Sequence, residues 1–130
     1  MTTWLNMLAV AAGGALGSVS RYLITLGSAA VPGGSSLLGT TIANVLGCAA
    51  IGALAVYVEF DGMINERLSL AIRVGFLGGL TTFSTFAAES SGLATDGRWA
   101  ATGLYLAANL LIGWTVLMIA SGAMKSWMAT

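Results

Sequence analysis

Long hydrophobic stretches separated by short polar segments dominate this chain of 130 residues. Each stretch is close to the ~20 residues that a helix needs to cross the hydrocarbon core of a bilayer. The intervening segments carry proline, paired glycines or charged residues, which commonly mark turns. The pattern predicts an all-α membrane protein, a single domain over residues 1–130 with four transmembrane helices at residues 4–28, 36–59, 70–93 and 99–124.

Composition narrows the class of protein further. Hydrophobic residues make up 57% of the chain and charged residues 8%, with a mean hydropathy of +0.89, whereas a soluble domain carries about 25% charged residues. The absence of histidine and the single cysteine exclude a disulfide framework and a Cys/His metal cluster. A formal net charge of zero argues against nucleic acid as a partner. The first stretch is longer than a signal-peptide core, so we expect a retained span.

The third hydrophobic stretch is interrupted by the sequence GFLGGLTTFSTF at Gly75–Phe86. Gly78 and Gly79 tolerate unusual backbone torsions, and the hydroxyl residues that follow can cap a second half-helix. Irregular backbone persists at membrane depth where it is buried in protein, lines a watery cavity or holds an ion. Free carbonyls at such a point suit a hard cation, and free amides suit an anion. We therefore predict a broken third helix and a role in transport.

Neutral polar residues inside the other spans are few. Asn44 lies midway along the second span, and Tyr105 and Asn109 share one face of the fourth. They could form a polar stripe that contacts an ion, or hydrogen bonds between helices that contribute about 0.6–2 kcal/mol each. Phe83 and Phe86 leave a similar choice between core packing and the electropositive ring edges that an anion can contact.

Two charged residues lie deeper than the predicted loops. Arg21 is close enough to the far end of its span for the guanidinium to reach an aqueous vestibule, where it can attract anions. Glu89 lies about one helical turn beyond Phe86 and is either an interfacial residue or a proton carrier.

The positive charges leave the orientation of the chain open. Three of the five lie on the side shared by both termini and two on the opposite side, namely Arg67, Arg73 and Lys125 against Arg21 and Arg98. Because this bias normally sets orientation, a near balance is compatible with insertion both ways or with one weakly biased orientation. Insertion both ways would permit an antiparallel homodimer with its two-fold axis in the membrane plane.

Four segments resemble the small dual-topology fluoride channels, the Fluc or CrcB family. They are GGALGSVSRY at Gly13–Tyr22, GTTIANVLG at Gly39–Gly47, the interrupted sequence at Gly75–Phe86, and the spacing of Tyr105 and Asn109. The third segment is highly specific, and the resemblance covers nearly the whole chain. Relatives often carry serine or histidine at the position of Asn109.

The resemblance implies a fold, an activity and a set of residues. Two chains would form an antiparallel homodimer in the cell inner membrane, with two pores that export fluoride passively and confer fluoride resistance. A central structural Na⁺ would bind the backbone carbonyls of Gly78 and Thr81 from both subunits. The fluoride path would contain Asn44, Phe83, Phe86, Tyr105 and Asn109, with Arg21 near its aqueous end.

Two other functions are compatible with a small four-span protein. A proton-coupled exporter of the small multidrug type needs a carboxylate deep in the first span, and residues 4–28 contain none. Glu89 would have to take that role. A non-conducting assembly factor would explain the small glycine faces of the helices but not the interruption in the third.

Overall fold

The structure, a computed structural model, describes residues 2–61 and 64–130. Every regular element in these two ranges is helical. The first two spans are single helices, α1 (Thr2–Ala30) and α2 (Ser36–Asp61). The third consists of α3 (Glu66–Leu70), the π-helical η1 (Ala71–Leu77), α4 (Gly78–Leu80) and α5 (Phe83–Thr95). The fourth consists of α6 (Trp99–Ala107), the π-helical η2 (Ala108–Ile112) and α7 (Gly113–Met128).

Four helical segments are long and apolar enough to cross a membrane: Thr3–Ala30, Ser36–Phe60, Glu66–Thr95 and Trp99–Met128. The predicted all-α class with four long apolar helices is therefore confirmed. The third segment begins at Glu66, four residues before the start expected from hydropathy. Asn65 caps this end, since its side-chain oxygen accepts a 2.8 Å hydrogen bond from the Arg67 amide. Residues 62 and 63 of the expected connection lie outside the described residues.

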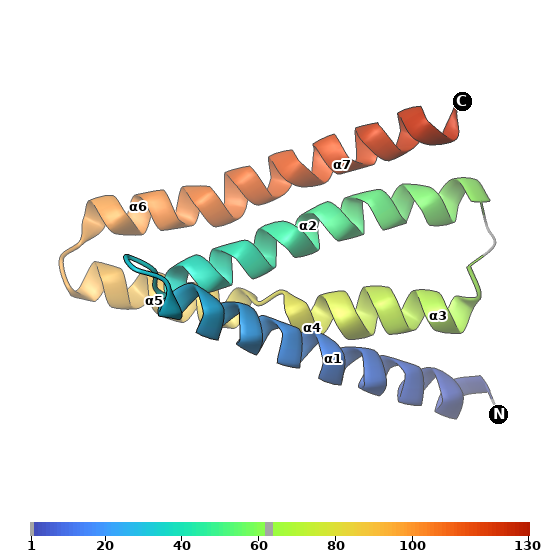
Figure 1. Ribbon diagram of the computed structural model, residues 1–130, viewed down its shortest axis with the longest axis horizontal. Helices are drawn as coiled ribbons and strands as arrows, with labels where there is room; N and C mark the ends of the chain where they lie inside the picture. Colours follow the sequence, from blue (N-terminus) through green and yellow to red (C-terminus); the bar gives the residue numbers. More distant parts are fainter. Residues whose placement is uncertain (1, 62–63) are drawn as a thin grey trace.

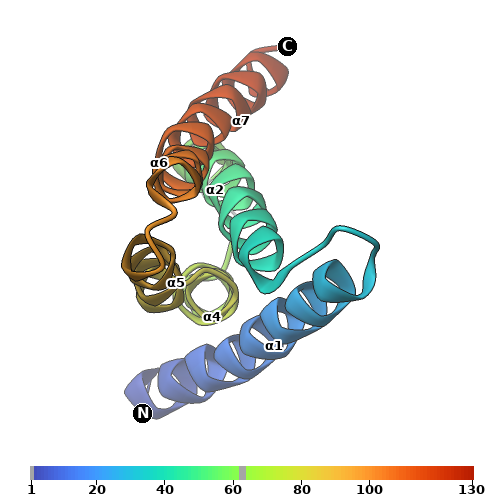
Figure 2. The same cartoon turned by 90° about the vertical axis from the view of Figure 1, so that its left-hand side faces the viewer.

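The spans run roughly alongside one another, and both termini lie at the same end of the molecule (Figure 1). Seen end-on, α2 lies between α1 and the α6–α7 helix (Figure 2), and α5 follows α4 along the length of the third span (Figure 1). A small core of Ala43, Leu77 and Leu80 joins α2 to the third span. Large apolar side chains are exposed along every span, as expected of surfaces that face lipid.

Close contact between α1 and the third span depends on glycine. A Cβ atom on Gly13 would lie 2.0 Å from the Ala71 carbonyl oxygen, and one on Gly17 would lie 2.0 Å from the Phe76 carbonyl oxygen. Both distances are far below a van der Waals contact, so only a residue without a side chain fits. Small residues that let helix backbones approach are the usual basis of packing in lipid. This contact brings α1 against the interrupted segment.

Candidate functional site

The third span is broken at Thr81 and Thr82, whose backbones are extended (φ −82°, ψ 156° and φ −151°, ψ 122°). We call these two residues the helix break. Thr82 caps the half-helix that follows, because its Oγ1 accepts a 3.3 Å hydrogen bond from the Thr85 amide. The interruption predicted from the glycines and hydroxyls is therefore present, and no proline is needed to produce it.

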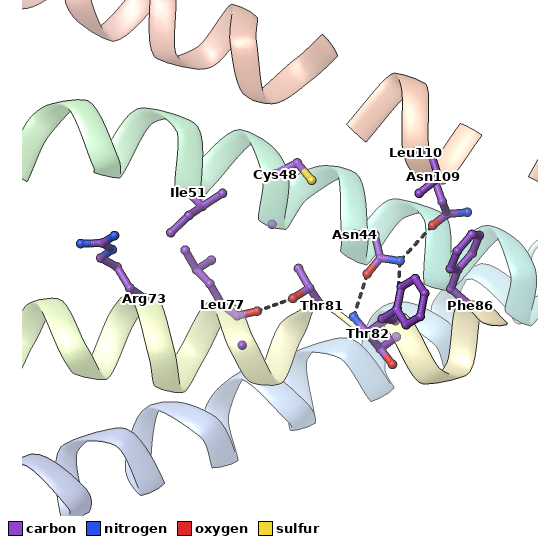
Figure 3. A pocket seen from close by; sticks show the side chains of 13 residues that line it. Asn44, Cys48, Ile51, Arg73, Leu77, Thr81, Thr82, Phe86, Asn109 and Leu110 are labelled. Atoms are coloured by element: carbon purple, nitrogen blue, oxygen red, sulfur yellow. Dashed lines mark hydrogen bonds between the residues drawn. The ribbon is translucent and has the colours of Figure 1, made fainter. Parts of the chain in front are cut away.

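Asn44 on α2 holds both backbone groups of Thr82. Its Oδ1 accepts a 2.8 Å hydrogen bond from the Thr82 amide, and its Nδ2 donates a 3.2 Å hydrogen bond to the Thr82 carbonyl (Figure 3). The same Nδ2 donates to Asn109 Oδ1 at 2.9 Å. The side chain thus replaces helical partners that the extended backbone has lost.

Asn109 on η2 is similarly engaged. Its Nδ2 donates to Thr41 Oγ1 and to the Tyr105 carbonyl oxygen, each at 3.1 Å, and the residue is 8% exposed. Both amide groups in the centre of the protein therefore already use their hydrogens within the chain. An anion that reached them would have to displace one of these bonds, and the 3.2 Å bond from Asn44 to Thr82 is the longest.

The helix break also deprives the carbonyl oxygens of Gly78 and Thr81 of their helical donors. In an unbroken helix the Thr82 amide would bond the Gly78 carbonyl and the Thr85 amide would bond the Thr81 carbonyl. These amides donate instead to Asn44 Oδ1 and Thr82 Oγ1. The Gly78 and Thr81 carbonyls, the two predicted cation ligands, have thus lost their helical donors to side chains and have the oxygen chemistry that hard cations prefer.

Arg21 contacts the helix-break region from α1. Its Nε donates a 3.1 Å hydrogen bond to the Gly79 carbonyl oxygen, 58 residues away in sequence, and the side chain is partly buried. This carbonyl would bond the Phe83 amide in an unbroken helix, so the guanidinium supplies a missing donor. The sequence placed Arg21 near an aqueous mouth but did not predict this contact.

Three aromatic rings are in contact in a row: Phe83 and Phe86 on α5, and Tyr105 on α6. The ring centroids of Phe83 and Phe86 are 5.8 Å apart with planes at 58°, and those of Phe86 and Tyr105 are 5.6 Å apart with planes at 48°. Phe86 is 5% exposed and Phe83 is 75% exposed. The Tyr105 hydroxyl donates to Glu89 Oε2 at 2.5 Å. Glu89 is therefore hydrogen-bonded to one of these aromatic residues. Neither interpretation from the sequence, an interfacial residue or a proton carrier, predicted this bond.

A cavity of about 370 Å³ lies between α2, the broken span and η2 (Figure 3). Four of the six residues predicted for the ion path line it, and both predicted cation ligands do so as well. The lining residues from the prediction are Asn44, Phe83, Phe86, Asn109, Gly78 and Thr81. Tyr105 and Arg21 lie outside this lining. The structure thus brings both asparagines, the exposed ring and the two predicted cation-binding residues to one place.

Sequence reasoning did not place Arg73 and Cys48 at this cavity, and both line it. Arg73 was assigned by its charge to the side of the termini, although it lies within the third apolar segment. Arg73, Leu77 and Thr81 recur every four residues, so they share one helical face. That periodicity was the available signal that Arg73 points to the same side as the helix break.

A family described as CrcB-like protein, Camphor Resistance (CrcB), matches residues 8–122. The chain belongs to the CrcB family. It is 38% identical to the "Fluoride-specific ion channel FluC" of Rhodopirellula baltica, with 98% of this chain and 99% of the relative covered. It is 44% identical to the protein of the same name from Nitratidesulfovibrio vulgaris, with 84% and 88% covered.

Membership of the CrcB family confirms the resemblance drawn from the four sequence segments. A third relative, the "Fluoride-specific ion channel FluC" of a Roseiflexus species, is 35% identical over 93% of this chain and 98% of its own length. Together with the four apolar segments, the family identifies this chain as a multi-pass membrane protein. All six residues predicted for the path, and the helix break, fall inside the part that matches the CrcB family.

Proposed function

We propose that this chain forms a fluoride-selective channel rather than an enzyme, and that it exports fluoride passively across the cell inner membrane and confers fluoride resistance. The observation that carries the proposal is the cavity at the helix break, where amide and aromatic side chains meet. CrcB relatives that match nearly the whole chain are named fluoride-specific ion channels, which supports the same choice of ion.

The chemistry of the cavity suits a small, strongly hydrated anion. A pore must replace the hydration of the ion with several donors and still bind it weakly enough for release. Asn44 supplies an amide donor, and Phe83 presents an exposed ring with an electropositive edge. The first amides of α5 have no acceptor within the helix and carry its positive dipole end. Neutral donors of this kind attract the anion without trapping it.

The direction of transport follows from the membrane potential. A cell interior that is negative drives an anion outward through a passive channel, so no coupled ion is required. Fluoride that enters from acid surroundings as hydrogen fluoride dissociates inside and would leave along this path. Resistance to fluoride is the resulting biological role.

Fluoride efflux from liposomes tests this function. Purified protein is reconstituted with internal fluoride, voltage is clamped with valinomycin and K⁺, and release is followed with a fluoride electrode. We expect rapid fluoride efflux that needs no proton gradient, while chloride is retained and protein-free liposomes release neither ion. Absence of efflux would contradict the channel. Efflux that required a proton gradient would favour the proton-coupled exporter that uses Glu89.

The channel is proposed to be an antiparallel homodimer of two oppositely inserted chains. The near balance of positive charges between the two sides supports insertion both ways. The cavity is open along one side of the single chain, and the large Phe83 ring beside it is 75% exposed. A second chain placed against this side would cover the ring and complete the walls of two equivalent paths, one per chain.

Na⁺ is proposed as a structural cofactor at the centre of this dimer, bound by the Gly78 and Thr81 carbonyls of both chains. The support is that these oxygens have lost their helical donors. Two carbonyls from each chain would give four oxygen ligands, and hard cations prefer oxygen. The ion would supply positive charge near the fluoride path without being part of it.

Removal of Na⁺ is expected to destabilise the dimer and to stop fluoride efflux. A ligand that binds the folded state alone stabilises it by about 2.7 kcal/mol at 100 times its dissociation constant. The thermal unfolding midpoint in detergent should therefore rise with Na⁺ concentration, and efflux should fall at least about tenfold when Na⁺ is replaced by N-methylglucamine. Choline at equal ionic strength is the control for general effects of salt on the unfolding midpoint. Equal midpoints in Na⁺ and choline would contradict the site.

A further inference from the structure

A series of hydrogen bonds connects the fourth span to the helix break through two asparagines. The series begins at the Tyr105 carbonyl, which accepts from Asn109 Nδ2 at 3.1 Å. It continues from Asn44 Nδ2 to Asn109 Oδ1 at 2.9 Å and ends where the Thr82 amide donates to Asn44 Oδ1 at 2.8 Å. Thr41 Oγ1 gives Asn109 Nδ2 a second acceptor at 3.1 Å.

We propose that Asn109 is a positioning residue: its carbonyl oxygen fixes the orientation of the Asn44 amide, and Asn44 in turn fixes the helix break. The inference rests on the proposed channel function for its transport consequences. It assigns Asn109 a role through Asn44 rather than as an independent contact of the ion.

The two backbone groups at the ends of the series determine its direction. A backbone carbonyl only accepts, so the NH₂ group of Asn109 must face Tyr105 and its oxygen must face Asn44. Asn44 then has to present its own NH₂ group to that oxygen, which leaves its oxygen for the Thr82 amide. A backbone amide only donates, so this last step is satisfied as well. If either asparagine were reversed, two donors or two acceptors would face each other.

The surroundings make a reversal costly. Asn109 is buried, and both its amide and that of Asn44 have partners within the protein. A buried polar group that loses its partner is strongly disfavoured, most of all in an apolar environment. Asn109 also lies in the π-helical turn η2, a local irregularity often found at functional sites. Asn44 Nδ2 also donates to the Thr82 carbonyl at 3.2 Å, so the fourth span and the Thr82 backbone favour the same orientation of the Asn44 amide.

A double-mutant cycle distinguishes this role from two independent ion contacts. The variants are Asn109→Leu, Asn44→Leu and the double variant, since leucine keeps the branched shape of asparagine, although it is larger, and removes its hydrogen bonds. Each single change is expected to lower fluoride efflux at least about tenfold. Fluoride efflux through the double variant should be within about twofold of efflux through the less active single variant, because both changes break the same series of hydrogen bonds. If the two asparagines contacted the ion independently, the two tenfold losses would multiply, and efflux through the double variant would fall about a hundredfold.

Hydrogen exchange at the helix break provides a readout that a general loss of stability would not reproduce. We expect amide exchange of the peptide that contains Thr82 to accelerate about tenfold in Asn109→Leu, although Asn109 does not contact that amide. The matched control is Ser121→Ala, which removes another bond between the fourth span and α2, from Ser121 Oγ to the Gly52 carbonyl at 2.9 Å. It should leave both exchange at Thr82 and efflux unchanged.

The outcomes separate the positioning role from the channel function. The positioning role would be overturned if the losses of efflux in the two single variants multiplied in the double variant. It would also be overturned if amide exchange at Thr82 were unchanged in Asn109→Leu. In either case, fluoride efflux from the wild type would still support the channel. Acceleration throughout α2 and α7 in both Asn109→Leu and Ser121→Ala would also overturn the positioning role. If wild-type protein conducted no fluoride, the channel would be rejected, and exchange at Thr82 would still decide whether Asn109 positions the helix break.

Discussion

Replacement of Gly17 by alanine is expected to lower the free energy of unfolding by about 2–3 kcal/mol, near the upper end of the usual cost of overpacking. The added Cβ would lie 2.0 Å from the Phe76 carbonyl oxygen and 2.9 Å from the Leu80 amide nitrogen. Both atoms belong to backbone, which cannot rotate away as a side chain can. α1 would have to move outward and would withdraw from the helix break, so we expect fluoride efflux to be lost as well.

Gly27→Ala on the same helix is the matched control. A Cβ atom at Gly27 would meet no atom within 4 Å, and alanine favours helix more than glycine by up to about 1 kcal/mol. This variant should be as stable as the wild type or slightly more stable. Thermal unfolding in detergent, monitored by the loss of the monodisperse peak in gel filtration, compares the two. Equal unfolding midpoints for Gly17→Ala and Gly27→Ala would show that the close approach of α1 does not stabilise the protein.

Phe83→Ala is expected to lower fluoride efflux by up to about tenfold, with little effect on the packing of a single chain. The ring is 75% exposed and lies 5.8 Å from the Phe86 ring, so its removal leaves no buried cavity within the chain. Edge-to-face contacts between two aromatic rings contribute about 0.5–1.5 kcal/mol each, and we take an anion at the same electropositive ring edge to be similar; about 1.4 kcal/mol corresponds to a factor of ten. Efflux measured in liposomes, normalised to the amount of dimer, gives the effect.

Two variants separate the ring edge from plain bulk. Phe83→Leu keeps an apolar side chain but has no electropositive edge, so it should lose efflux nearly as much as Phe83→Ala. Phe60→Ala removes another exposed ring, near the end of α2 and outside the cavity lining, and should conduct as the wild type does. Full efflux from Phe83→Leu would show that volume alone is required at this position.

Local patterns in the sequence were sufficient for the number of spans, the broken third helix and the family. Hydropathy over windows of about 20 residues reports whether a helix can face lipid, whatever its neighbours are. Glycines and hydroxyls at Gly78–Thr82 act on the torsions and caps of their own backbone. The third span begins at Glu66, before the start expected from hydropathy, because Asn65 caps the helix there although Glu66 and Arg67 make this end polar.

The partners of the polar side chains were decided by the tertiary structure. Asn44 bonds residues 38 and 65 positions away, and Arg21 bonds a carbonyl 58 positions away. Spacing along one helix shows which residues share a face, but not which face of another helix they meet. That depends on how closely the helices approach and how they are rotated, which Gly13 and Gly17 set through backbone contacts with the third span.

The sequence by itself therefore determined a four-span membrane protein of the CrcB family with an interruption in its third helix, because each of these properties depends on neighbouring residues. The tertiary structure alone decided that Asn44 holds Thr82, that Arg21 caps Gly79, and that Tyr105 bonds Glu89. Each of these bonds requires two helices to meet at a particular rotation, and no local pattern specifies that rotation.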